Sequence, residues 1–152
     1  MTMPDPEDAI GAGLRRYADF FATLTPDSLD RLDGLVTDDV HFRDPFNDIR
    51  GRAAMKAVFA QMYRDCTDIG FTIDGSLRQG DEAFLKWTFR YRPRRFGGAV
   101  PWTAVGVSEL HFAPDGRVRA HLDHWDAGAQ FYARLPLLGP LVRWVRGRLQ
   151  HR

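Results

Sequence analysis

The chain changes its hydrophobic period near Ile69. Before that point, apolar residues recur mainly every three or four positions, which predicts an amphipathic helix from about Glu7 to Leu24. Thr25-Pro26 then provides an N-cap followed by a proline in the first helical turn, so a short second helix is expected there. A third helix is predicted from Arg52 to near Asp65. The apolar positions of the three helices are Ile10, Leu14, Tyr17, Phe21, Leu24, Leu29, Leu32, Val36, Ala54, Val58, Phe59 and Met62.

After Ile69 the period is two, which is typical of half-buried strands. The predicted strands run from Phe71 to near Gln79, from Ala83 to Tyr91, from Trp102 to Phe112 and from Arg117 to Asp126. Gln79-Gly80-Asp81 and Pro114-Asp115-Gly116 are predicted turns, because glycine adopts turn conformations freely. Phe131 to Leu149 is expected to form one or two closing helices around Pro136 and Gly139-Pro140.

One earlier strand precedes this series and ends at Asp44. Pro45 lacks a backbone N–H and pushes the residue before it toward an extended conformation, so the strand stops there. A run of helices with one strand, followed by a run of strands, indicates an α+β fold. We therefore expect a single domain over 1–152: a curved mixed or antiparallel sheet, a cone-shaped barrel whose N-terminal helices pack on the concave face. Its core spans about 9–133, and a basic amphipathic C-terminal helix is added at about 134–150.

Composition excludes several classes of protein. The net charge of +1 does not favour nucleic acid as a partner, and one cysteine, Cys66, permits neither an internal disulfide nor a cysteine metal cluster. The acidic start, MTMPDPEDAI with Asp5, Glu7 and Asp8, is unlike a signal peptide, and no run of eighteen apolar residues occurs. We expect a cytoplasmic protein without a metal or other cofactor.

Asp44 is the first candidate for chemistry. A carboxylate fixed at a strand end by Pro45, with Phe46 beside it, can point into a cavity, where desolvation raises its pKa toward that of a general base. The alternative is that Asp44 only makes a turn or a helix-capping hydrogen bond, as most Asp-Pro pairs do.

Large aromatic side chains give the second clue. Trp87, Phe89, Trp102 and Trp125 fall on the inward faces of their strands, with small residues such as Gly106 between them. Together with Phe59 of the third helix, they predict a cavity for a flat apolar ligand between sheet and helices. The alternative is an ordinary aromatic core.

The order of elements, with Arg16-Tyr17, Asp44-Pro45, Gly51 and the closing Phe112…Gly116-Arg117-Val118, resembles the nuclear transport factor 2-like superfamily. Within it, the chain is most similar to ketosteroid isomerases and SnoaL-type polyketide cyclases, over roughly Ala9 to Ala133. The resemblance to isomerases implies that Asp44 moves the proton and that Tyr17 hydrogen-bonds the oxyanion. The second oxyanion donor of those isomerases, a protonated Asp, falls at Ser108 here, and a serine donates less strongly.

The resemblance to cyclases implies a different pair, His121 and Asp123 of His121-Leu122-Asp123. Residues two apart on a strand share a face, so both side chains can reach one cavity and divide the work of acid and base. The alternative is a hydrogen-bonded pair in the core. His124 has the opposite parity and is not expected to share a metal with His121.

The end of the chain is basic and apolar at once. No Asp or Glu follows Asp126, whereas Arg134, Arg143, Arg146, Arg148 and Arg152 do. A broad apolar face lies beside these arginines and consists of Leu137, Leu138, Leu141, Val142, Trp144, Val145 and Leu149. This helix therefore either packs on protein, over the cavity or in a dimer, or lies on an anionic membrane surface.

The sequence is therefore compatible with three alternative functions. The first is a cofactor-free isomerase or cyclase acting on a small apolar carbonyl compound, with Asp44 or His121/Asp123 as the base. The second is a non-catalytic binder of an apolar ligand or lipid. The third is a homodimeric interaction module that pairs through the outer face of the sheet, which carries Lys86, Thr88, Arg90, Val105, Val107 and Glu109.

Overall fold

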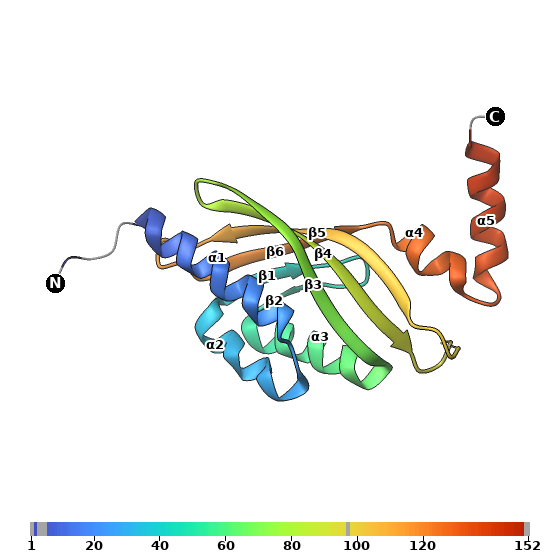
Figure 1. Cartoon of the computed structure of the whole chain (residues 1–152), viewed down its shortest axis with the longest axis horizontal. Helices are drawn as coiled ribbons and strands as arrows, with labels where there is room; N and C mark the ends of the chain where they lie inside the picture. Colours follow the sequence, from blue (N-terminus) through green and yellow to red (C-terminus); the bar gives the residue numbers. More distant parts are fainter. Residues whose placement is uncertain (1, 3–5, 97, 151–152) are drawn as a thin grey trace.

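The computed structural model describes residue 2 and residues 6–96 and 98–150. In chain order its elements are α1 (Pro6–Ala22), the 3-10 helix η1 (Pro26–Arg31), α2 (Leu32–Leu35), β1 (Val36–Arg43), β2 (Asp48–Arg50), α3 (Arg52–Asp65), β3 (Cys66–Gln79), β4 (Glu82–Pro93), β5 (Trp102–Phe112), β6 (Val118–Trp125), α4 (Ala127–Gln130), the 3-10 helix η2 (Tyr132–Arg134) and α5 (Leu138–Leu149) (Figure 1). Asp5 of the acidic start and Arg152 of the basic end lie outside the described residues. The α+β class predicted from the sequence is confirmed.

Within the described residues, six strands form one curved, unclosed sheet in the order β2-β1-β6-β5-β4-β3. β1 and β6 pair in parallel and all other neighbours are antiparallel, so the early strand is inserted beside the last one. The hairpin between β1 and β2 was not predicted from the sequence. β2 is three residues long with Ile49 as its one apolar side chain, which is too short a segment to show a period.

One other local expectation needs correction. Val36 was assigned to the second helix, but that segment is η1 followed by α2, and Val36 begins β1 opposite Val118 of β6. Val36 is β-branched, and such a side chain packs well in a sheet. The two predicted glycine turns are confirmed, with φ of 62° at Gly80 and 86° at Gly116.

Two hydrophobic clusters fill the inner side of the sheet. Under α1, α2 and α3 lies the larger cluster, which includes Tyr17, Phe20, Phe42, Met55, Leu85, Leu110 and Phe112. The smaller cluster lies farther along β4 and β5 and consists of Trp87, Tyr91, Trp102 and Ala104, with Phe89, Trp125, Phe131 and Leu135 packed against it. The predicted packing of helices on the concave face therefore accounts for the first cluster, and the segment after β6 covers the second.

The position of α1 depends on two glycines. A Cβ at Gly13 would lie 2.0 Å from the carbonyl oxygen of Gly116, so the helix touches the β5–β6 turn backbone to backbone. Gly116 has a positive φ, which glycine adopts without strain. This contact holds α1 close to the ends of β5 and β6, with Tyr17 one turn farther along the helix.

Candidate active site

Three neighbouring strands and one helix bring five polar or aromatic side chains together. Trp87 comes from β4, Ser108 from β5, and His121 and Asp123 from β6, all on the inward parity of their strands. Ser108 pairs directly with Asp123 in the sheet register. Tyr17 reaches the same place from α1, although it is 104 positions away from His121 in the sequence.

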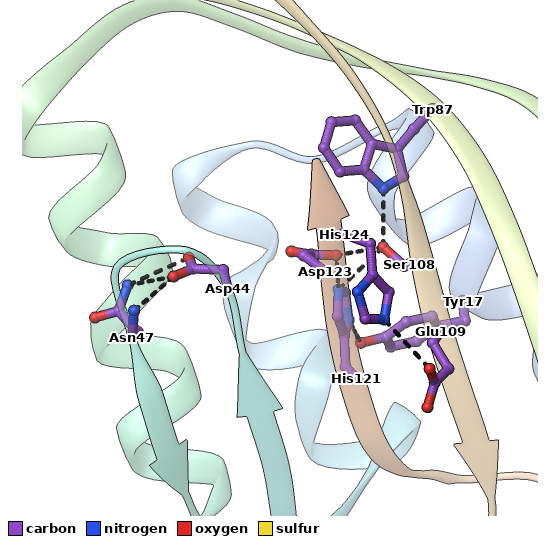
Figure 2. Close-up of polar contacts among 9 residues, drawn as sticks. All are labelled: Tyr17, Asp44, Asn47, Trp87, Ser108, Glu109, His121, Asp123 and His124. Atoms are coloured by element: carbon purple, nitrogen blue, oxygen red, sulfur yellow. Dashed lines mark hydrogen bonds and ion pairs between the residues drawn. The ribbon is translucent and has the colours of Figure 1, made fainter. Parts of the chain in front are cut away.

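Hydrogen bonds join these side chains into one network (Figure 2). The Tyr17 hydroxyl lies 2.6 Å from Nδ1 of His121, and Nε2 of His121 lies 2.7 Å from Oδ1 of Asp123. Ser108 Oγ lies 2.5 Å from the same Oδ1, and Trp87 Nε1 lies 2.9 Å from Ser108 Oγ. A longer contact of 3.2 Å joins Ser108 Oγ to His121 Nε2.

The protons in this network can be placed from donor and acceptor chemistry. The indole of Trp87 only donates, so Ser108 accepts from it and directs its own O–H to Asp123. An ionised Asp123 only accepts, which places a proton on Nε2 of His121 and leaves Nδ1 to accept from the Tyr17 hydroxyl. Every hydrogen bond in this network is thus donated in the direction of the Asp123 carboxylate, which carries the negative charge.

Burial makes this arrangement rigid. Tyr17 and His121 expose 0% and 2% of their surface, so neither ring nitrogen of His121 has access to bulk water. Burial, with a smaller contribution from the negative charge of Asp123, raises the pKa of Tyr17 well above its ordinary value. Tyr17 therefore stays a neutral hydrogen-bond donor to His121 at physiological pH.

A small cavity adjoins the carboxylate end of the network. Its volume is about 30 Å³, close to the share of one water molecule in the liquid. The lining residues are Phe21, Phe59, Phe71, Ile73, Leu85, Trp87, Ser108, His121 and Asp123. Among the described residues Oδ1 of Asp123 receives both hydrogen bonds and Oδ2 receives none, so Oδ2 is the oxygen left for a molecule in the cavity.

Five of the residues predicted to form the site line this cavity: Phe59, Trp87, Ser108, His121 and Asp123. Tyr17 lies behind His121, and its hydroxyl donates to the imidazole, whereas the resemblance to isomerases placed it at the substrate's oxygen. Its position corresponds to that of a residue that orients His121. The bond from Trp87 to Ser108 was not predicted. The sequence holds only a weak signal for it, namely that both residues have inward parity on adjacent strands.

The structure corrects the expectation that Asp44 points into the cavity. Its Oδ1 accepts hydrogen bonds from the backbone N–H groups of Phe46 and Asn47, at 2.8 and 2.7 Å, and from the Asn47 amide. Figure 2 shows the carboxylate turned toward Asn47 in the loop between β1 and β2. Burial raises the pKa of Asp44 and these hydrogen bonds oppose the rise. Short-range turn bonding, the alternative considered for Asp-Pro, fixes this side chain.

Three of the predicted aromatic residues pack away from the cavity. Phe89, Trp102 and Trp125 belong to the second hydrophobic cluster, where Phe89 stacks on Tyr91 and Trp102 meets Phe131 edge to face. Gly106 allows this packing: a Cβ there would lie 2.6 Å from the Trp87 ring and 2.8 Å from Cβ of Trp125. The strand period placed these rings on the correct face, but it could not tell that the segment after β6 would fill the space between them.

The opposite face of the sheet carries His124. Its Nε2 lies 3.2 Å from Oε1 of Glu109, and Oε2 of Glu109 lies 2.6 Å from Nε2 of His111. Figure 2 marks the bond between His124 and Glu109 with a dashed line. No group of three or more metal-ligating side chains occurs among the described residues. The helices that the structure describes include none with the length and apolarity to cross a membrane.

Comparison with models of known protein families identifies the family of this chain. The model of the SnoaL-like domain matches residues 15–121, more than half of the chain, including Tyr17, Ser108 and His121. The chain belongs to the SnoaL-like domain family. No curated protein matches it in sequence.

Solved structures agree with this SnoaL-like fold. A SnoaL-like polyketide cyclase described as putative, from Jannaschia sp., superposes with a TM-score of 0.67 at 13% identity, over 85% of this chain and 92% of that one. A hypothetical protein of ketosteroid isomerase-like fold from Catenulispora acidiphila, solved with trimethylamine, gives 0.66 at 16% identity, over 91% and 98%. An LEH-like epoxide hydrolase from M. tuberculosis gives a TM-score of 0.63 at 19% identity, over 99% of both chains. At these identities the likeness establishes the fold of this SnoaL-like chain.

Proposed function

We propose that this SnoaL-like protein catalyses cofactor-free proton transfer on a small apolar carbonyl compound, with Asp123 as the base. The observation that supports the proposal is the polar network itself. A buried hydrogen-bonded chain from Tyr17 through His121 ends on a carboxylate that adjoins an apolar cavity and keeps one oxygen free. Buried networks of this kind are costly unless every group is satisfied, and paired titratable groups beside cavities are candidates for acid and base chemistry.

The reaction follows from the positions of the donors. Oδ2 of Asp123 takes a proton from a carbon next to the substrate's carbonyl, and the electrons of that C–H bond move to give an enolate. The negative charge then lies on the substrate's oxygen. Once Asp123 is protonated it accepts hydrogen bonds less strongly, so the hydroxyl of Ser108, which lines the cavity, turns to donate to that oxygen. In an isomerisation, the protonated Asp123 returns the proton to another carbon. In a cyclisation, the enolate carbon attacks a second carbonyl, the π electrons of that carbonyl move to its oxygen, and Asp123 returns the proton to this oxygen to give a hydroxyl.

The aromatic wall limits the substrate. A cavity of about 30 Å³ admits a substrate only if side chains such as Phe21, Phe59 and Phe71 change rotamer, because ligand sites are typically about ten times larger. We therefore propose a small, flat carbonyl compound. The free thiol of Cys66 supports a reducing, cytoplasmic setting for the reaction.

Hydrogen–deuterium exchange tests the base. Cyclohexanone in heavy water serves as the probe, and NMR follows deuterium incorporation next to the carbonyl. Asp123→Asn is expected to lower the enzyme-dependent rate at least about 100-fold, since general base catalysis contributes factors of this size. The control, Asp39→Asn, makes the same chemical change at an exposed site. Equal rates in the wild type and Asp123→Asn would remove Asp123 from the mechanism.

The small cavity favours a second candidate, a non-catalytic dimerisation module. Phe84 and Val105 expose 42% and 44% of their surface on the outer face of the sheet, where a second copy would cover them. Val105→Lys is then expected to convert a dimer into a monomer in sedimentation velocity. A monomeric wild type, or a co-purified apolar ligand found by native mass spectrometry, would count against this candidate.

A further inference from the structure

The helix α5 exposes an unusual amount of apolar surface. Leu138, Leu141, Val145 and Leu149 recur at steps of three and four and so share one face. All four are exposed, as are Leu137 at 95% and Trp144 at 59%. A contiguous exposed apolar face of this kind marks an interaction surface.

The fold holds α5 away from the site. Figure 1 shows the helix standing at one end of the molecule, beyond α4, and its residues do not line the cavity. Gly139 is buried against η2, where a Cβ would lie 2.6 Å from the carbonyl oxygen of Ala133, and Arg143 donates a hydrogen bond to that same oxygen. Of the alternatives considered for this helix, a cover over the cavity does not agree with the structure. The family match also ends at residue 121, before α5 begins.

Charge indicates what the face binds. The chain has no acidic residue after Asp126, whereas Arg143, Arg146 and Arg148 lie in α5. Arg146 is eight residues after Leu138, on the border of the apolar face, and Arg148 lies over the ring of Trp144 at 5.2 Å. Two copies meeting through α5 would bring these arginines together without any acidic partner on the helix, which disfavours self-association.

We propose that α5 docks on an anionic membrane surface, with its axis in the plane of the interface. Leucines and valines would enter the boundary between headgroups and acyl chains, Trp144 would lie at headgroup level, and the arginines would meet lipid phosphates. The helix has 12 residues, so it lies on a bilayer and does not span it.

Vesicle flotation of the full-length protein tests this docking. Vesicles of phosphatidylcholine with about 30% phosphatidylglycerol are compared with pure phosphatidylcholine vesicles, because anionic lipid attracts basic segments. The wild type is expected to float with the anionic vesicles only, and to be released in about 1 M salt, where the screening length is about 3 Å. Arg146→Gln/Arg148→Gln is expected to lower the partition coefficient roughly thirtyfold, since each surface arginine contributes about fivefold.

Two further variants complete the experiment. Leu141→Ala/Trp144→Ala is expected to abolish flotation, and Arg15→Gln/Arg16→Gln, a matched loss of two exposed charges on α1, is expected to leave it unchanged. Circular dichroism confirms that each variant is folded. Flotation that is absent, equal on both vesicle types, or equally weakened by the α1 variant overturns the proposal. A dimer in lipid-free sedimentation that Leu141→Ala/Trp144→Ala dissociates also overturns it, since a second copy then occupies the face.

Discussion

Tyr17→Phe measures the buried network directly. The substitution removes the hydroxyl that lies 2.6 Å from Nδ1 of His121 and leaves the ring in contact with Phe21. Because His121 is 2% exposed, its Nδ1 would then be buried without a partner. Such a loss costs about 1 to 3 kcal/mol of unfolding free energy. In a chain of this size each kcal/mol lowers Tm by about 2 to 4 °C, so we expect a drop of about 2 to 12 °C.

Urea unfolding followed by circular dichroism provides the assay, with Tyr63→Phe as the control. Tyr63 carries a buried hydroxyl that has no hydrogen-bond partner among the described residues, so the same chemical change should be neutral or stabilise by up to about 1 kcal/mol. The ¹⁵N chemical shifts of the His121 imidazole should also show the proton on Nε2 in the wild type. The reasoning is refuted if Tyr17→Phe unfolds at the wild-type urea concentration, or if both tyrosine variants lose the same stability.

Further predictions concern the packing of α1 and the turn at Asp44. Gly13→Ala is expected to destabilise the fold by about 3 kcal/mol or more, because the new Cβ meets the Gly116 carbonyl. Gly34 has open space around it, so Gly34→Ala should stabilise the fold by about 0.5 to 1 kcal/mol. Chemical denaturation measures both changes. Asp44→Ala should cost about 1 to 2 kcal/mol through lost turn bonds, and Asp44→Asn much less. Burial raises the pKa of Asp44 in the folded state above its ordinary value of 3.8. The unfolding free energy of the wild type should therefore fall relative to that of Asp44→Asn as the pH rises above 3.8. Urea titrations at several pH values measure this difference, and a change in the opposite direction contradicts the prediction.

Much of the fold could be predicted from local pattern. A helix or strand that covers a core must place apolar side chains at the period of its own backbone, so Ile10 to Leu24 and Ala83 to Tyr91 indicated their elements without any tertiary information. Gly80 and Gly116 marked turns for a similar local reason, the positive φ that each adopts. The strand β2 was not predicted, because three residues are too few to show a hydrophobic period.

The candidate site depended on distances that no local pattern contains. Parity alone placed His121 and Asp123 on one face, but the bond from Tyr17 to His121 joins residues 104 positions apart and required α1 to touch the β5–β6 turn. Asp44 differs, because its direction is fixed by a hydrogen bond from Asn47, three residues later. The strand pattern does not contain this information. The size of the cavity was likewise set by how Phe21, Phe59 and Phe71 pack. The sequence by itself determined which residues face inward, because that depends on backbone period. Only the tertiary structure decided which of them meet, because contact depends on how the elements pack and on the volume that their side chains leave.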